Sequence, residues 1–469
     1  FKDYHSLMPN IKMDNLFFEP IPMVTTGGPT TMYRRRRPGV DTKYRWDNGG
    51  TIVSMIRPIG IFNSDLFVVI STGSPTLQLW RISSSNVRTY VGAVSTTAVD
   101  ITQPLVKMIY TQFGLIVLNN NHELYVYTIA GVLQSITVPE SYVAQDICSV
   151  SNYLMIACTS GRVYYLEPNK WVFKDDSGNT DSVLNYFTAE SLPDGLVGIQ
   201  QVRGNIYLFG QLSTEIWQLT GDTGTDGSTL PFSKAVGMDL MKGAIDRKAI
   251  VLLDNTVMWI GQDWTLYRVD TVPSRISTFN VEAQIQASSY YNMWTYTIRG
   301  HQFLVIQLDD VTLQYDVATQ RWTTLSSYNS SLFEFTGWQD LTETLLFDNS
   351  TCNILNFNVN RFTDYNGPIT ATISAILEAS TPLYFKNLLL TTSQSTSVDY
   401  NYSIRPCSST TFTSEGTFSL DRGDMTRSAL YMCGSAVGPY VEIQITVDSD
   451  ADINIISLEY NAPIMYRYQ

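Results

Sequence analysis

The sequence predicts an all-β fold: an irregular β-propeller of six or seven blades, with an extended N-terminal segment and a C-terminal β-sandwich. Of the 469 residues, 44% are hydrophobic and only 16% are charged, and Tyr, Phe and Trp are abundant, as is typical of strands. Helix formers rarely recur at the 3.6-residue helical period, whereas short hairpin patterns repeat along the chain. A chain of this length exceeds one ordinary core, so several domains are expected.

The first predicted element is the extended, proline-punctuated segment 1–58. Over residues 1–60, 9 basic residues face 5 acidic ones, so this end carries a charge of +4 and the remainder −17. The four successive arginines are expected in an exposed loop between two Gly-Pro turns. Guanidinium groups bind phosphates or acidic protein surfaces, and we predict partner docking by Arg34, Arg35, Arg36 and Arg37. The alternative is a solvated loop that docks no partner.

The second predicted element, residues 59–362, contains seven hairpins. Each consists of an apolar run, a polar turn containing Asn, Asp, Gly or Ser, and a run that includes an aromatic residue. They begin about 40–55 residues apart, as propeller blades do, and radial repetition would bury their apolar faces. A stack of β-sandwiches is the alternative. The hairpins span 66–82, 114–129, 153–168, 205–219, 249–261, 303–317 and 344–357.

The third predicted element, residues 363–469, alternates apolar and polar residues with period two. This pattern is typical of half-buried antiparallel strands. We therefore expect a separate β-sandwich of about a hundred residues.

The sequence predicts no catalytic, cofactor or metal site. Histidine occurs only at His5, His122 and His301, without a HExxH or GxSxG motif, so an enzyme is not expected. The five cysteines form no CxxC pair, which disfavours zinc. The acidic run 448–452 resembles the start of a calcium loop, but it lacks the later glycine and the terminal glutamate, and a turn between two strands is the expected structure.

A glycosidase is the enzymatic alternative, because propellers can bring carboxylates or arginines together at their centre. Sialidase-type Ser-x-Asp-x-Gly-x-x-Trp boxes are absent. Single arginines that could converge are Arg81, Arg162, Arg203, Arg247, Arg268, Arg321 and Arg361.

The net charge of −13 disfavours a general DNA-binding protein, because such binding needs clustered basic residues. It does not disfavour a conduit through which DNA slides. The N-terminus lacks the apolar core of a signal peptide, and the apolar runs are shorter than a membrane span. Synthesis in a cytoplasm is expected.

A stretch near the middle of the chain, AESLPDGLVGI, is followed by the hairpin GNIYLFGQLSTEIWQLTG. Together they resemble the packaged-DNA-stabilisation, or tail accessory, family of short-tailed bacteriophages, with close similarity over about 35 residues. The Arg-x-Pro-Gly unit at 36–39 also resembles the start of that family. The first stretch carries the family motif in Ala189, Glu190, Ser191, Pro193, Asp194, Gly195 and Gly198.

The resemblance implies a structural virion protein located in the tail. It implies a hexameric ring that docks below the portal and its adaptor, closes the channel to retain packaged DNA and lets the double-stranded DNA through on ejection. Tail spike, needle or fibre proteins would attach below. A carbohydrate-binding or glycoside-cleaving propeller, acting as a receptor-binding protein or a host-surface enzyme, is the alternative.

We interpret the motif as a structural corner. Pro193, Asp194 and Gly195 form a predicted turn in which proline presets φ and glycine takes a positive φ. Glu190 would accept hydrogen bonds at the end of a blade. Gly198 would permit a close backbone approach at the start of the next strand.

Overall fold

The computed structural model divides the chain into two compact units, and almost all its regular structure is β. Unit 1 comprises 1–42, 305–334 and 355–469, and unit 2 comprises 43–304 and 335–354. The helices among the described residues are α1 (Phe279–Ala287), η1 (Phe62–Ser64), η2 (Pro139–Ser141) and η3 (Arg247–Ala249). The structure describes residues 11–20, 32–46, 50–72, 77–97, 106–173, 185–189, 192, 194–221, 230–269, 272–339, 343–348, 353–364, 367–378 and 383–461.

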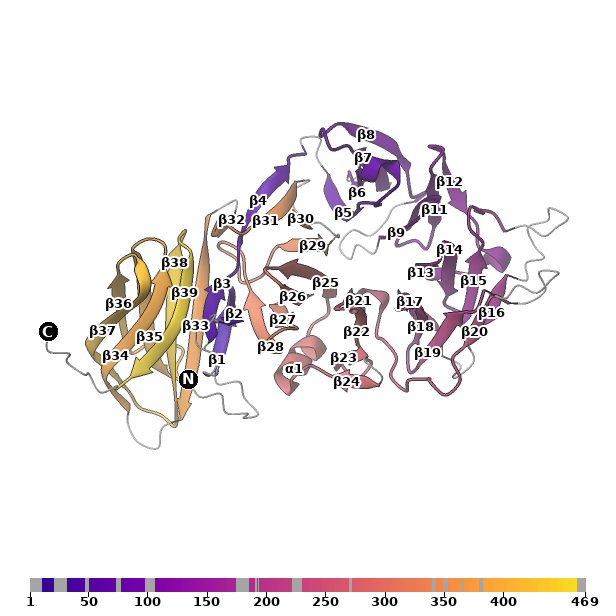
Figure 1. Cartoon of the computed structure of the whole chain (residues 1–469). Helices are drawn as coiled ribbons and strands as arrows, with labels where there is room; N and C mark the ends of the chain where they lie inside the picture. The colour runs from indigo at the N-terminus through magenta and orange to yellow at the C-terminus, as the bar shows by residue number, and fades with distance from the viewer. Residues whose placement is uncertain are drawn as a thin grey trace, which may run out of the picture. The chain divides into compact units, whose positions relative to one another are not determined.

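Unit 2 contains five four-stranded antiparallel sheets, each formed by consecutive strands. They follow one another in sequence order around a centre, with β5, β9, β13, β17 and β21 innermost (Figure 1). The first two sheets are β5 (Thr51–Ile56), β6 (Leu66–Ser71), β7 (Leu77–Ile82) and β8 (Arg88–Ala93), then β9 (Lys107–Thr111), β10 (Gly114–Leu118), β11 (Leu124–Thr128) and β12 (Leu133–Ile136). The third and fourth are β13 (Ala144–Val150), β14 (Tyr153–Cys158), β15 (Arg162–Leu166) and β16 (Tyr186–Thr188), then β17 (Leu196–Val202), β18 (Asn205–Gly210), β19 (Thr214–Leu219) and β20 (Phe232–Lys234). The fifth is β21 (Ile250–Leu253), β22 (Thr256–Ile260), β23 (Leu266–Val269) and β24 (Pro273–Arg275).

These sheets pack face to face, and this packing explains their sequence. Every residue of β6, β10 and β22 is buried, because each second strand has a neighbouring sheet on both faces. One hydrophobic cluster joins each sheet to the next: Leu79 and Leu115 share a cluster, as do Ile116 and Ile156. A single four-stranded sheet would leave one apolar face in water, so the circular succession is what stabilises it.

The later strands continue the up-and-down order in two further sheets. In a ten-stranded sheet, β25 to β28 follow one another and β28 then pairs with β1 (Ile11–Asp14); in a four-stranded sheet, β29 to β31 are completed by β4. The boundary between the units falls within β26 and β31. The bounds are β25 (Tyr291–Ile298), β26 (His301–Leu308), β27 (Thr312–Asp316), β28 (Arg321–Leu325), β29 (Phe335–Gln339), β30 (Thr344–Asp348), β31 (Ile354–Asn358) and β4 (Gly39–Tyr44).

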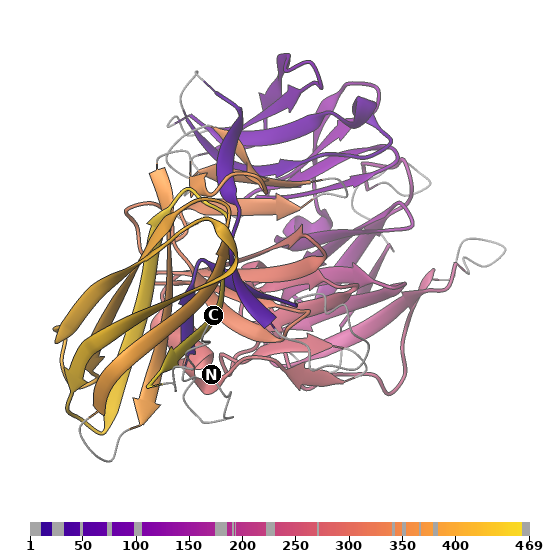
Figure 2. The same ribbon diagram turned by 60° about the vertical axis from the view of Figure 1, so that its left-hand side comes forward.

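Unit 1 contains two sets of strands that share one core, and Figure 2 shows the long strands β33 to β39 among them, in orange to yellow, running side by side. In one set β1, β33, β38, β35 and β36 are neighbours; in the other the order is β2, β3, β39, β34, β37. The bounds are β1 (Ile11–Asp14), β2 (Leu16–Pro20), β3 (Met32–Arg36), β32 (Thr363–Asp364), β33 (Gly367–Glu378), β34 (Leu383–Gln394), β35 (Val398–Pro406), β36 (Ser414–Leu420), β37 (Gly423–Ala436), β38 (Tyr440–Ser449) and β39 (Ile453–Tyr460).

The predicted arginine-rich loop is instead part of a sheet. Arg34, Arg35 and Arg36 belong to β3, which pairs with β2 and, through Arg34 and Arg35, with β39. The prediction was wrong because β39, the second partner of β3, comes from the far end of the chain and leaves no local signal. The predicted hairpins are all present as neighbouring strands.

Candidate functional site

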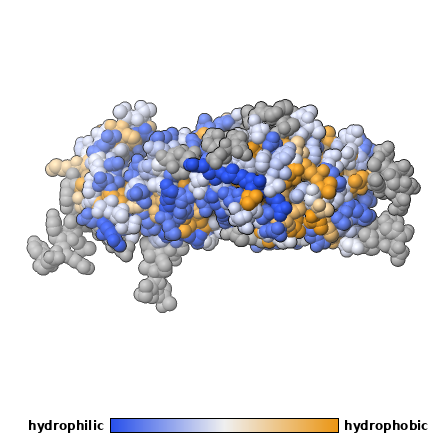
Figure 3. Space-filling model, turned by 90° about the horizontal axis from the view of Figure 1, so that it is seen from above, coloured by the Kyte–Doolittle hydropathy of each residue, from blue (hydrophilic) through white to orange (hydrophobic). Residues whose placement is uncertain are grey.

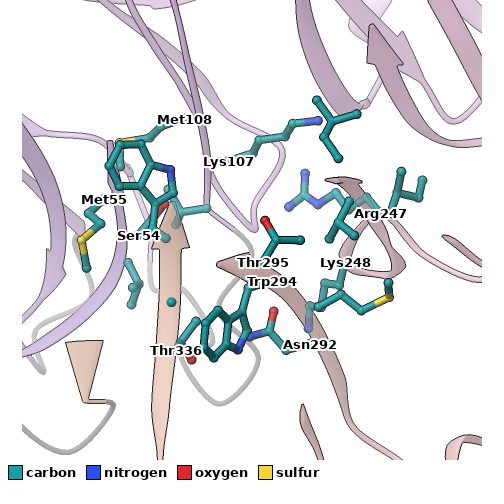
Figure 4. A pocket seen from close by; sticks show the side chains of 18 of the residues that line it. Ser54, Met55, Lys107, Met108, Arg247, Lys248, Asn292, Trp294, Thr295 and Thr336 are labelled. Atoms are coloured by element: carbon teal, nitrogen blue, oxygen red, sulfur yellow. The ribbon is translucent and has the colours of Figure 1, made fainter. Parts of the chain in front are cut away.

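The inner strands of unit 2 enclose a cavity of about 400 Å³. Its lining comes from β5, β9, β17, β21, β25 and β29, together with η3 and the residues that flank these strands. Figure 4 shows basic side chains from two sides of this cavity, with polar and aromatic groups between them. Those singled out below are Lys107, Arg247, Lys248, Asn292, Trp294 and Thr336.

Lys107 forms part of one side of the cavity and makes an ion pair with a buried carboxylate. Its Nζ lies 2.8 Å from Oδ1 of Asp146, a carboxylate that is 2% exposed. The same carboxylate accepts a hydrogen bond of 2.9 Å from the backbone N–H of Ile199. Lys107, Asp146 and Ile199 lie on β9, β13 and β17, so this one carboxylate ties the inner strands of three consecutive sheets together.

Arg247 and Lys248 lie next to each other on η3. Asp246 caps this helix by accepting from the Lys248 N–H at 2.9 Å. Arg247 is buried, and its Nη1 donates to the Gln145 carbonyl at 2.7 Å. Burial lowers the pKa of Arg247, although Asp146 and Asp246 act in the opposite direction. Lys248 is half-buried, with Nζ 5.9 Å from the centre of the Tyr290 ring.

The opposite side of the cavity combines aromatic and uncharged polar groups. Trp294 is 5% exposed and lies so close to Gly337 that a Cβ there would be 2.2 Å from the indole ring. Glycine is therefore required at this position of β29. Asn292 and Thr336 are half-buried in the same lining. In Figure 4, Lys248, Asn292 and Trp294 gather on one side, while Lys107 and Arg247 approach each other on the other.

The described lining of this cavity does not contain the two carboxylates of a glycosidase. No Asp or Glu belongs to the lining of the described cavity, and such hydrolases place two carboxyl groups beside the scissile bond. Of the seven arginines considered for convergence, Arg247 is the one in this lining. Others pair locally, as Arg81 does with Asp65 at 2.7 Å.

The arginines of the N-terminal segment are largely held inside unit 1. Arg36 and Arg37 are each 1% exposed. The Arg37 guanidinium makes a bidentate pair with Asp364 at 2.8 and 2.9 Å and lies over the Phe333 ring. Arg35 is 15% exposed and pairs with Glu19.

Arg36 is held by main-chain groups. It donates to the carbonyls of Ser449 at 2.6 Å, Ile369 at 3.2 Å and Ala451. Burial, followed by the neighbouring charge of Arg37, lowers its pKa to about 10.

The family motif lies in the chain between β16 and β17, and three of its residues are outside the described residues: Glu190, Ser191 and Pro193. Asp194 accepts from the N–H groups of Leu212 and Ser213 at 2.7 and 3.0 Å, in the β18–β19 turn. The motif thus fastens the next hairpin.

Neighbouring atoms leave no room for a side chain at two glycines of the motif. The predicted positive φ of Gly195 was wrong: its φ lies outside the left-handed region, and a Cβ there would meet the Thr159 carbonyl oxygen at 2.6 Å. At Gly198 a Cβ would lie 2.4 Å from Cδ1 of Ile250. Ala189 donates its N–H to Gly161.

The remaining sequence candidates lie outside this cavity. Within the described ranges, His122 contacts the Ala144 carbonyl at 2.8 Å, and His301 stacks on Phe303 in β26. The acidic run 448–452 joins β38 to β39. Among the residues that the structure describes, no group of three or more metal-ligating side chains occurs, and no helix is long and apolar enough to span a membrane. Sequence reasoning missed Lys107, Asn292 and Trp294, whose only signal is their position on inner strands, and Lys248, which lies on η3 just before β21.

Consecutive four-stranded sheets arranged around a central cavity define a β-propeller protein. The chain belongs to the family described as bacteriophage P22 Gp10, beta-propeller, which matches residues 69–347. This match confirms the predicted resemblance to the packaged-DNA-stabilisation family of short-tailed phages. No curated protein matches the sequence. The crystal structure of the computationally designed Ika8 protein matches 66% of this chain and 96% of its own, with 10% identity and a TM-score of 0.37.

Proposed function

We propose that this protein is a subunit of the phage tail hub, or nozzle. In this role it assembles into a closed ring of six copies below the portal and adaptor, closes the channel after packaging and lets DNA pass on ejection. Tail spikes, needle or fibres attach to the ring. The observation that carries the proposal is the family match over residues 69–347.

Two physical properties support this role. The propeller is rigid, because hydrophobic clusters and the Asp146 network join successive sheets, and a ring subunit must keep its shape under the pressure of packaged DNA. The net charge of −13 also suits a channel, since an acidic surface repels the phosphate backbone and does not hold it.

We further propose that three parts of the chain have different roles. Seven successive groups of four strands, from β5–β8 to β29–β31 with β4, act as seven blades of a propeller formed mainly by 59–362. Strands β33 to β39, within 363–469, act as a C-terminal β-sandwich, and residues of β1 and β2 belong to the same core. Segment 1–58 supplies docking contacts, and the partly exposed Arg34 and Arg35 are better placed for a partner than the buried Arg36 and Arg37.

The test is electron microscopy of the full chain, alone and mixed with the portal–adaptor complex of its phage. We expect ring-shaped particles with sixfold class averages that cap the portal. A monomer that does not bind the complex would overturn the hub assignment, and a ring of another order would overturn the hexamer. The docking variant is Arg34→Ser, Arg35→Ser, which should bind the portal–adaptor more weakly; because Arg35 also pairs with Glu19, its circular dichroism is compared with that of the parent, and weaker binding counts only if the two spectra agree.

A carbohydrate-binding role is the second candidate, and the mixture of aromatic and basic groups in the cavity favours it over glycoside cleavage. Turnover of a host polysaccharide by the purified chain would reverse that order.

A further inference from the structure

We propose that neighbouring copies in the ring join through two different surfaces: an apolar surface with acidic groups on unit 1 of one copy covers an apolar surface with basic groups on unit 2 of the next copy. This inference rests on the proposed function, because it names the contact that joins the subunits of the hub. A closed cyclic ring of more than two copies needs such a head-to-tail contact, in which each subunit offers one surface and receives another.

The first surface, called the unit-1 end, lies where β33, β37 and β39 end. Strand β34 begins opposite the last residue of β37, strand β38 begins opposite the last residue of β33, and β39 ends beside β34. Both strand sets of unit 1 therefore contribute to this surface. Its apolar side chains are 42–93% exposed, and they are Tyr384, Met432, Val437, Tyr440 and Tyr460.

The backbone holds Met432 in water. The pairing of β34 with β37 shifts register between Phe385 and Asn387, and Met432, on the strand opposite this bulge, has a φ of 54°. A residue with a Cβ rarely adopts this conformation, and such strain is concentrated at functional sites. Bulges also redirect side chains. Because Met432 is both strained and 93% exposed, we assign it as the side chain that the neighbouring copy receives.

The unit-1 end carries acidic groups that can pair with a neighbour. Glu378 is the last residue of β33, and Glu415 lies at the start of β36, which contacts β37. Both are exposed, and neither forms an ion pair with another described residue. Together with Glu459, they exceed by one the exposed lysines of this end, Lys12 and Lys386. Contact between two copies of this end would bring its glutamates together, whereas a basic surface would attract them.

The second surface, called the unit-2 edge, is formed by β8 and β12 and the turns that precede them. Both strands are the outermost of their sheets. They lie close together, since a Cβ at Gly92 would be 2.5 Å from Cδ2 of Leu133. Figure 3, which is seen from the side of these two strands, shows a broad hydrophobic area on this part of the molecule. The apolar side chains that are 50–60% exposed here are Val87, Tyr90, Ile129 and Val132.

The charged groups beside the unit-2 edge are basic. Arg88 lies in β8 with its guanidinium 4.8 Å from the centre of the Trp46 ring, and it donates to the Arg45 carbonyl. The Arg45 side chain is exposed, and neither guanidinium has a carboxylate partner among the described residues. Segments 77–97 and 124–136 contain no acidic residue. The two surfaces are therefore complementary in charge as well as apolar, and they contain Tyr, Met and Arg, which are enriched in protein interfaces.

The test is negative-stain microscopy of the full chain in the presence of the portal–adaptor complex, with one variant of each surface. Met432→Arg and Val132→Arg should each lower the yield of rings by about tenfold or more. Val236→Arg is the matched control, because Val236 is 95% exposed in unit 2 but belongs to neither surface, and it should form rings as the parent does. Parental yields in either surface variant would overturn this contact and leave the hub proposal standing. Absence of rings in the parent would overturn the ring itself.

A second variant, Met432→Gly, separates docking from folding. Glycine accepts a φ of 54° without strain, so this variant should melt no lower than the parent in differential scanning fluorimetry and still lose the ring. Rings formed by Met432→Gly at the parental yield would refute the assignment of Met432.

Mixing Met432→Arg with Val132→Arg tests the head-to-tail pairing. Each variant keeps one intact surface, so the mixture should contain dimers in analytical ultracentrifugation, whereas either variant alone should be monomeric. A mixture that contains only monomers would rule out the pairing of these two surfaces.

A charge exchange tests their complementarity. Glu378→Lys with Glu415→Lys should lower the yield of rings, and adding Arg45→Glu should recover part of it, because opposite charges then face each other again. A yield that does not recover would contradict the pairing of these charges across the contact.

Discussion

At the scale of single residues, the buried pair of Arg37 and Asp364 is the most sensitive point of unit 1. Both side chains are at most 2% exposed and make two direct hydrogen bonds. Arg37→Met should lower the free energy of unfolding by about 3–5 kcal/mol, because it leaves the Asp364 carboxylate buried without its counter-ion. Urea unfolding followed by tryptophan fluorescence measures the change.

Two further variants distinguish the stability lost with this buried pair from the stability lost when any paired arginine is replaced. Arg275→Met removes a more exposed pair with Glu282 and should cost less than about 1 kcal/mol. The double variant Arg37→Met, Asp364→Asn should recover part of the lost stability. Equal losses for Arg37→Met and Arg275→Met would contradict the assignment of a buried pair.

The sequence marked the four arginines but could not show that they are structural. The partners of Arg36 lie 333 to 415 positions away, and they are main-chain carbonyls whose identity no side chain reveals. A run of like charges is ordinarily solvated, so burial could be found only from the folded chain. The cavity residues were missed for a related reason: each is an ordinary residue of a strand or of the short helix η3 until several sheets come together in the fold.

At the scale of elements, Asp194 stabilises the turn of the β18–β19 hairpin. Asp194→Ala should cost about 1–3 kcal/mol, because the Leu212 and Ser213 N–H groups lose a charged acceptor. Hydrogen exchange at 210–214 should accelerate. Asp194→Asn keeps one acceptor oxygen, so its stability should lie between those of the parent and Asp194→Ala. Exchange that is as slow in Asp194→Ala as in the parent would argue against this role.

Glu123 makes the connection after β8 sensitive to pH. Burial raises its pKa, but hydrogen bonds from Thr96 and Asn119 outweigh burial and lower the pKa below the usual value. Because the folded pKa is the lower one, the contribution is complete above the unfolded pKa of about 4.3 and is lost as the pH falls through the folded value.

This linkage predicts the behaviour of Glu123→Gln. Near neutral pH the variant should melt at a lower temperature than the parent, and the difference should shrink below about pH 4. Differential scanning calorimetry across this range measures it. A difference that is independent of pH would assign the effect to packing rather than to the charge.

The hairpins were predictable because their information is local. An apolar run, a turn residue and a second run specify β10 and β11 within about fifteen residues. Their outer partners were harder to predict: β16 and β20 contain three residues each, too few for a periodic signal. Strand β4 completes an array with β31, although the two lie over 300 residues apart in the chain.

At the scale of the whole molecule, the acidic balance predicts how the protein treats DNA. At about 0.15 M salt the purified chain should bind a duplex of about 20 base pairs with a Kd weaker than about 100 µM, because few basic groups are available to displace counter-ions. Fluorescence anisotropy at several salt concentrations tests this. Micromolar binding that weakens steeply with salt would contradict a channel that lets DNA slide.

The pairing of β3 with β39 means that β3 is synthesised long before one of its two partner strands. Arg36 leaves the ribosome 413 residues before Ser449, whose carbonyl it will bind. At ordinary translation rates the nascent β2–β3 segment must wait roughly 20 to 80 seconds for that partner. The blades can close while synthesis continues, because their contacts are local. Strands β2 and β3 are therefore secured long after they are made, and a chain truncated before β39 should expose β2 and β3 to proteases.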